Sequence, residues 1–151
     1  MNETPSPELP VLVVDDEAQA LTSFELTLRS ASMNHFICCQ DSREIMPVLA
    51  RQEIDIILLE LWMPHLSGEE LLRRITVDYP DVPVIIVTGA DDVETAVKCM
   101  KQGAFDYIVK PVEKSRLVSS VKRGIELREL HRENQLLKAR ILSDRLSCPE
   151  A

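Results

Sequence analysis

Short apolar runs alternate along this chain with stretches whose apolar residues recur at helical spacing. Runs of this kind, rich in Val, Ile and Leu, are typical of strands buried on both faces of a sheet. Strands that alternate with helices are joined by right-handed crossovers and therefore lie parallel. The sequence thus predicts an α/β fold, a parallel sheet between two helical layers, with strands at residues 9–14, 35–39, 54–59, 82–87 and 105–109.

The helical stretches have recognisable ends as well as periodic apolar residues. Asp41 or Ser42 is placed to cap the second helix, and Asp91 or Asp92 the fourth, because short polar side chains accept bonds from free backbone N–H groups. Gly103 is suited to end the fourth helix. Helices are predicted at residues 18–31, about 42–51, 69–79, 93–103 and 113 to about 143.

Composition narrows the functional classes. The net charge of -8 and the pI near 4.9 argue against sequence-independent binding to nucleic acid, which needs clustered Lys and Arg. The first eight residues lack the basic and apolar segments of a signal peptide. No apolar run approaches a membrane span, and the cysteines show no disulfide or zinc spacing. A cytoplasmic protein without membrane contact is expected.

Functional side chains follow four of the predicted strands. In open parallel sheets, ligands collect at the carboxyl ends of the strands, so these side chains should share one edge. Clustered carboxylates repel one another unless a cation such as Mg²⁺ compensates them. With a hydroxyl and a lysine nearby, the chemistry indicated is phosphoryl transfer onto a carboxylate. The residues concerned are Asp15, Asp16, Glu17, Glu60, Thr88 and Lys110.

Taken singly, each of these residues has an ordinary structural explanation. An Asp after a strand is more often a helix cap than a ligand. Thr88 alone would be a turn residue, and Lys110 followed by Pro111 means little. Their joint placement at four strand ends favours a functional site.

Three segments resemble the receiver domain of two-component response regulators, over residues 9–126: "VLVVDDE", "LLELWMPHLSGEELL" and "VIIVTGADDVETAVKCMKQGAFDYIVKPV". The last segment is similar to the subgroup that regulates sigma-54 transcription activators. The resemblance implies a flavodoxin-like (βα)5 sandwich with strand order 2-1-3-4-5. It also implies a phosphorelay signalling role rather than an enzyme, with a cognate sensor histidine kinase as partner.

The resemblance assigns a role to each matched residue. Asp15 and Asp16 match the acidic pair that binds Mg²⁺, and the backbone carbonyl of Trp62 matches a further metal ligand. The Trp62 side chain is expected near the entrance of the site. Lys110 matches the lysine that contacts the phosphate, with a cis peptide bond to Pro111.

Two further residues match the switch of the family. Thr88 matches the hydroxyl that moves toward the phosphoryl group. Tyr107 matches the aromatic residue whose rotamer follows that movement.

Glu60 departs from the family, whose phosphoacceptor at this position is Asp. Its extra methylene displaces the carboxylate by up to ~1.5 Å, and a misplacement near 1 Å can cost roughly a hundredfold in rate. The longer side chain also brings negative charge toward the phosphoryl position, where it could pair with Lys110 or accept a hydrogen bond from Thr88. Glu60 therefore either imitates the phosphorylated state in part or leaves the domain unswitched, and it is expected to weaken or alter Mg²⁺ binding.

The end of the last predicted helix carries a heptad pattern. Asn134 occupies an a position, where asparagine favours a paired, parallel, in-register dimer. Glu133 and Lys138 occupy g and e positions, where opposite charges can meet across the pair. The pattern covers only about two heptads, so an amphipathic helix packed on its own domain is the alternative. The a and d residues are Leu127, Leu130, Asn134, Leu137 and Ile141.

The domain organisation follows from these patterns: a disordered N-terminus at 1–8, the receiver at 9–126, a coiled-coil linker at 127–144 and a flexible tail at 145–151. No Gly-rich phosphate loop or helix-turn-helix follows, so the effector, an ATPase in sigma-54 activators, is expected to be absent. The chain is then a regulatory fragment or a stand-alone receiver. A stand-alone structural dimerisation module is one rival.

A phosphatase-like enzyme with Mg²⁺ is the other rival. It would need an Asp nucleophile and normally a second Asp two residues later. Here Glu60 is followed by Leu61 and Trp62, which counts against it.

Overall fold

The central sheet has the predicted parallel architecture. The structure, a computed structural model, describes residues 9–147, so the predictions for residues 1–8 and 148–151 lie outside it. All neighbouring strands are parallel, and their order is β2-β1-β3-β4-β5, which confirms the predicted fold class. The strands are β1 (Val11–Val14), β2 (Phe36–Cys39), β3 (Ile56–Leu59), β4 (Val84–Thr88) and β5 (Asp106–Val109).

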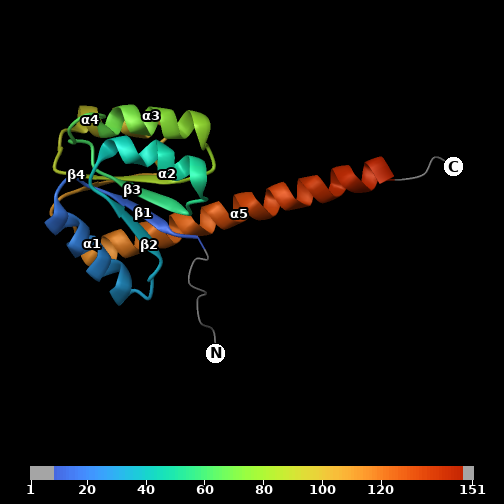
Figure 1. Cartoon of the computed structure of the whole chain (residues 1–151), viewed down its shortest axis with the longest axis horizontal. Helices are drawn as coiled ribbons and strands as arrows, with labels where there is room; N and C mark the ends of the chain where they lie inside the picture. The colour runs from blue at the N-terminus through green and yellow to red at the C-terminus, as the bar shows by residue number, and fades with distance from the viewer. Residues whose placement is uncertain (1–8, 148–151) are drawn as a thin grey trace.

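Helices cover both faces of this sheet (Figure 1). α2, α3 and α4 lie on one face, while α1 and the first part of α5 lie on the other. The rest of α5 extends well beyond the sheet. The helices are α1 (Ala18–Ser30), α2 (Ile45–Arg51), preceded by the 3-10 turn η1 (Ser42–Glu44), α3 (Gly68–Asp78), α4 (Val93–Gln102) and α5 (Lys114–Ser147).

Each strand supplies side chains to two hydrophobic cores. Successive residues of a strand point to opposite faces, so Leu12 and Val14 pack with α2, α3 and α4. Val11 and Val13 pack with α1 and α5. Burial on both faces explains why the strands read as continuous apolar runs rather than as an alternating pattern.

The predicted ends of several elements are refined. Asp41 accepts a hydrogen bond from the backbone N–H of Arg43 (2.9 Å) and caps the turn before α2. Asp92 rather than Asp91 caps α4, accepting from the N–H of Thr95 (3.0 Å). Gly103 ends α4 with a φ of +112°, a conformation that glycine adopts without strain.

α5 is longer than predicted, since it continues to Ser147 rather than ending near Ser143. The heptad pattern stops before that point, but good helix formers such as Arg145 and Leu146 carry the helix on. Within residues 9–147, no helix is both long and apolar enough to cross a membrane.

Candidate functional site

The sheet brings the residues at the ends of four strands to one edge. The backbone N–H of Glu60 donates to Val14 O (3.1 Å), which aligns the ends of β3 and β1. The N–H of Lys110 donates to Thr88 O (2.8 Å), which aligns β5 with β4. Because the strands are parallel and in register, their carboxyl ends converge as predicted from the sequence.

Lys110 joins the two buried acids of this edge. Its ammonium donates to Asp15 Oδ2 (2.6 Å) and to Glu60 Oε1 (3.0 Å). Asp15 is 0% exposed and Glu60 is 6% exposed. Carboxylates withdrawn from water to this extent need a partner charge, and a single ammonium serves both. The peptide bond between Lys110 and Pro111 is cis, as expected.

The two acids in turn keep Lys110 protonated. Burial, the largest single influence, lowers the pKa of Lys110, but the hydrogen bonds and charges of Asp15 and Glu60 together outweigh it. The pKa of Lys110 is therefore raised above its ordinary value. The group remains a cation throughout the physiological range.

The second oxygen of Glu60 turns back onto its own backbone. Oε2 accepts from the N–H of Leu61 (2.7 Å) and, weakly, from that of Trp62 (3.4 Å). Asp15 behaves similarly, since its Oδ1 accepts from the N–H of Glu17 (2.9 Å). The longer side chain of Glu60 thus fits the site by folding over the start of the following loop.

The sequence suggested Lys110 or Thr88 as the partner of Glu60, and in the structure Glu60 contacts Lys110. Thr88 is completely buried, and its Oγ1 accepts from the N–H of Ala90 at 3.4 Å. Among the described residues, no hydrogen bond joins Thr88 to Glu60. The Thr88 hydroxyl instead contacts the loop that leads into α4.

Tyr107 contacts the same loop from β5. Its hydroxyl donates to Ala90 O at 2.7 Å. Burial raises the pKa of Tyr107 to about 12, and nearby negative charges including Glu60 add to the rise, so the hydroxyl remains a donor. Ala90 therefore receives contacts from both predicted switch residues.

Asp16 and Trp62 lie at the outer part of the site. Asp16 is half-buried, and its backbone carbonyl accepts from Gln40 Nε2 (3.2 Å). Trp62 is 63% exposed, and its ring lies against Gly89, where an added Cβ would meet Trp62 Cζ3 at 3.2 Å. The indole therefore covers the residue that follows Thr88.

The donor chemistry of the site fits a hard divalent cation. Mg²⁺ prefers oxygen ligands and keeps several waters, so it needs only one or two protein carboxylates. Asp15 and Asp16 supply such groups, although Lys110 competes for Asp15. In residues 9–147, no three His, Cys, Asp or Glu side chains lie close enough together to form a ready-made cage.

Two residues shape the loop after Glu60 and were not predicted to do so. Ser42, predicted only as a possible cap, donates to Pro64 O (2.7 Å) and accepts from the N–H of Leu66 (3.0 Å). Gly68 approaches the end of β3 so closely that an added Cβ would lie 2.2 Å from Glu60 O and 2.5 Å from Leu61 Cα. The "SG" before the third helix was the only sequence signal for this approach.

We expect Gly68→Ala to lower the free energy of unfolding by about 3 kcal/mol, because the methyl group would clash with backbone that carries Glu60. In an exposed helix the same change is normally stabilising. Urea denaturation monitored by circular dichroism measures the difference.

Gly124→Ala is the matched control. Its added Cβ would meet Ile56 Cδ1, the far end of a side chain, and the gain in helix propensity offsets part of the overpacking. An equal or larger loss for Gly124→Ala would contradict the importance assigned to Gly68.

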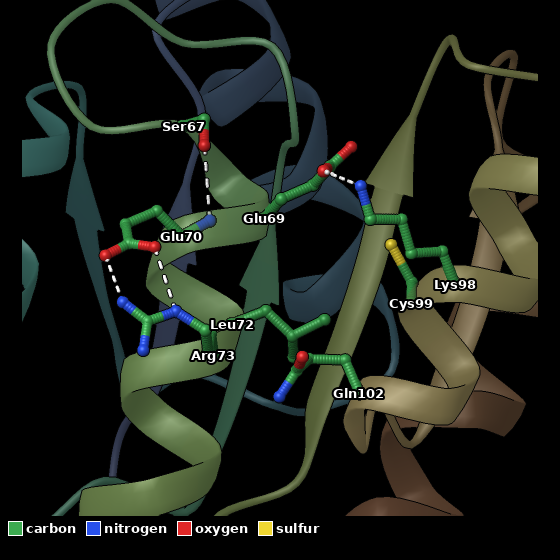
Figure 2. Close-up of a pocket in the computed structure, with 8 residues that line it drawn as sticks. All are labelled: Ser67, Glu69, Glu70, Leu72, Arg73, Lys98, Cys99 and Gln102. Carbon is green, nitrogen blue, oxygen red and sulfur yellow. Dashed lines mark hydrogen bonds and ion pairs between the residues drawn. The ribbon is translucent and has the colours of Figure 1, made fainter.

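A cleft of about 270 Å³ lies between α3 and α4, and its lining does not include Asp15, Glu60 or Lys110. Figure 2 shows that its charges are paired with one another, Glu69 with Lys98 and Glu70 with Arg73. The Glu69–Lys98 distance is 3.2 Å, and it links α3 to α4. Both side chains are substantially exposed, so this pair contributes at most about 1 kcal/mol. The paired charges make the cleft a poor match for a charged ligand.

Comparisons with known proteins agree with this fold. A putative NtrX-like response regulator of Rickettsia felis is 34% identical over 137 residues, which are 89% of this chain and 29% of that protein. The C4-dicarboxylate transport transcriptional regulatory protein DctD of Pseudomonas aeruginosa is 33% identical over 85% of this chain and 28% of its own length. The chain thus spans less than a third of the length of these relatives.

A solved structure and a family model complete the comparison. The response regulator receiver domain protein of Clostridium thermocellum has 32% sequence identity, a TM-score of 0.74, and coverage of 81% of this chain and 98% of its own. The model of the response regulator receiver domain matches residues 11–122. The residues gathered at the strand ends are those that the predicted resemblance named, and the chain belongs to the response regulator receiver domain family.

Proposed function

We propose that this receiver is a signalling module in which Glu60 occupies the phosphoacceptor position and biases the domain toward its phosphorylated form. The observation that carries the proposal is the contact of Lys110 Nζ with Glu60 Oε1 at 3.0 Å. In this proposal Lys110 is the residue that would contact a phosphoryl group, and Glu60 supplies a negative oxygen to it permanently. The site is therefore partly satisfied before any phosphoryl donor arrives.

The mimicry is partial for an electrostatic reason. A carboxylate carries one charge and two oxygens, while a phosphoryl group carries close to two charges and three oxygens. One oxygen of Glu60 is also taken by the N–H of Leu61. Among the described residues, neither oxygen of Glu60 bonds to Thr88, the proposed switch hydroxyl.

The position of Tyr107 supports a bias toward one state. Its hydroxyl bond to Ala90 O ties β5 to the loop between Thr88 and α4. In the proposed switch, Thr88 and Tyr107 act through this loop. A phosphoryl group on an Asp at position 60 would add a direct bond to Thr88.

Mg²⁺ is the cofactor proposed for this site. Asp15 and Asp16, with the backbone carbonyl of Trp62, would hold it, and the bound ion would offset negative charge during phosphoryl transfer. Lys110 already offsets part of the negative charge of Asp15 and Glu60, and the longer side chain of Glu60 displaces its carboxylate, so Mg²⁺ affinity is expected to be weaker than at a site with Asp at position 60.

Acetyl phosphate labelling of the parent chain and of Glu60→Asp, each followed by sedimentation, tests the proposal. If Glu60 is a silent acceptor that does not mimic phosphorylation, the parent should have the same oligomeric state as unlabelled Glu60→Asp. Multiple turnover of a phosphate ester would instead favour a phosphatase-like enzyme.

The second part of the proposal is a parallel homodimer through the far end of α5. Apolar side chains at the heptad positions are exposed: Leu130 is 61%, Leu137 55% and Ile141 55% exposed. We call Leu127, Leu130, Asn134, Leu137 and Ile141 the seam. Pairing two seams would bury these side chains, and Asn134 would fix the register.

Leu137→Glu should abolish self-association through the seam, because two buried carboxylates would face each other at a d position. Ala139→Glu adds the same charge at an outward-facing f position and should leave the association unchanged. Sedimentation velocity over a concentration series measures both. An undiminished dimer in Leu137→Glu would exclude pairing through the seam.

In the full signalling pathway, we place this chain between a cognate sensor histidine kinase and an effector. The domain division proposed is a receiver over residues 9–126 and a linker over 127–144. The effector proposed is a sigma-54 activator ATPase, since the matched segments resemble that subgroup. The module itself would act through its dimer geometry, without binding nucleic acid or membrane directly.

A further inference from the structure

α5 crosses the end of the sheet opposite the acidic site. Gly124 allows this, because an added Cβ there would lie 2.3 Å from Ile56 Cδ1 at the start of β3. The helix then passes the segments that precede β3 and β4, where two aspartates face it. Figure 1 shows the helix leaving the domain beyond this point.

The first aspartate is deeply buried and paired with the helix. Asp55 is 2% exposed, and its Oδ1 accepts from Arg132 Nη2 at 3.1 Å. Burial, the largest influence, raises the pKa of Asp55, while Arg132 and Arg128 counteract part of the rise. The ionised carboxylate therefore depends on the two arginines of α5 for compensation.

The second aspartate contacts the next turn of the helix. Asp81 accepts from Gln135 Nε2 at 2.6 Å, and His131 Nδ1 lies 3.7 Å from its other oxygen. The Nε of Arg128 and the Nδ1 of His131 are shielded from solvent without a hydrogen-bond partner. Together, Asp55, Asp81, Arg128, His131, Arg132 and Gln135 form what we call the base cluster.

The base cluster and the seam use different faces of α5. Residues 128, 131, 132 and 135 lie on one side of the helix, at spacings of three and four. At about 100° per residue, the mean direction of the seam lies roughly 130° away from them. Docking the helix through the base cluster thus leaves the seam exposed.

We propose that the base cluster is a latch that fixes both the exit direction of α5 and its rotation about its own axis. The receiver and the seam then move as one rigid body, without a hinge between Gly124 and Gln135. A buried ion pair contributes little net stability, but its geometry is demanding, so it specifies orientation. This inference uses the seam of the proposed function but does not depend on the role of Glu60.

The two shielded nitrogens that lack a hydrogen-bond partner, Arg128 Nε and His131 Nδ1, lower the stability of the latch. Each shielded polar group without a partner offsets part of the stabilisation that the pairs supply. Loss of one charged member should therefore be enough to release the helix turn locally while the receiver core stays folded. A released helix would bend where it leaves the sheet.

Amide hydrogen exchange of peptides covering residues 124–135 tests the latch. Arg132→Met keeps an apolar stem but removes the charge opposite Asp55, and exchange in this segment should accelerate about tenfold or more. Arg140→Met, in the exposed part of the same helix, should leave the segment unchanged. Exchange in the β3 and β4 peptides shows whether the receiver remains folded.

Asp55→Asn separates charge pairing from lost packing. If the pair is the latch, Arg132→Met should change exchange much less in the Asp55→Asn background than in the parent, because the two effects are not additive. Unchanged exchange in Arg132→Met, or equal acceleration by Arg140→Met, would overturn the proposal. Sedimentation of the same samples reports the dimer separately, so a monomeric parent would reject the seam without rejecting the latch.

Discussion

Glu60→Asp is expected to accept a phosphoryl group from acetyl phosphate at least roughly a hundredfold faster than the parent chain. The side chain of Asp is shorter by one methylene, so it returns the carboxylate to the position from which in-line attack is possible. Lys110 and Asp15 remain in place to receive the phosphoryl oxygens and the metal. Phosphate incorporation with Mg²⁺ present is measured for both chains.

Sedimentation of the same samples distinguishes a Glu60 that mimics phosphorylation from one that leaves the domain unswitched. A biased parent should associate like phosphorylated Glu60→Asp, while unphosphorylated Glu60→Asp should associate less. Glu60→Gln is the matched control, because it keeps the length of Glu60 but removes the charge that pairs with Lys110. If the parent, Glu60→Gln and unphosphorylated Glu60→Asp all behave alike, Glu60 does not mimic phosphorylation.

The sheet could be predicted because its physical cause is local. Residues 56–59 and 84–87 are apolar without alternation, which is typical of strands covered on both faces. The strand ends were less predictable. Pro10 and Pro83 lie within the predicted runs but have no N–H to donate, and β1 and β4 begin after them.

The site could be predicted as a set of residues but not as a set of contacts. Placing acids after parallel strands implies that they meet, as Asp15 and Glu60 do across Lys110. Whether Glu60 would choose Lys110 or Thr88 depends on side-chain rotamers, which a sequence does not specify. The structure shows the lysine together with a backbone contact to Leu61 that was not foreseen.

Contacts between distant segments left little signal in the sequence. Asp55 lies within a predicted strand, and nothing nearby indicates that Arg132, 77 residues later, would reach it. The sequence around Gly68 indicates only the approach of a helix, whereas in the structure this glycine lets α3 approach the backbone of Glu60. Such pairings follow from the path of the folded chain and not from local pattern.

Lys110→Met should lower the free energy of unfolding at neutral pH by about 3 kcal/mol. The substitution keeps an apolar stem but leaves Asp15 and Glu60 buried and without their common cation. Lys98→Met is the control, because its ion pair with Glu69 is exposed and should contribute less than about 1 kcal/mol. Urea denaturation of the three chains provides the comparison.

The pH dependence of unfolding distinguishes the charge of Lys110 from the packing of its side chain. The folded-state pKa of Lys110 is raised, so the stabilisation it supplies is complete below the ordinary lysine pKa, about 10.4, and is lost as pH rises through the folded value. The difference in the free energy of unfolding between the parent and Lys110→Met should therefore become smaller in alkali. Mg²⁺ should stabilise Lys110→Met more than the parent, because it would replace the missing cation. A gap independent of both pH and Mg²⁺ would mean that Lys110 stabilises the fold through its aliphatic stem rather than through its charge.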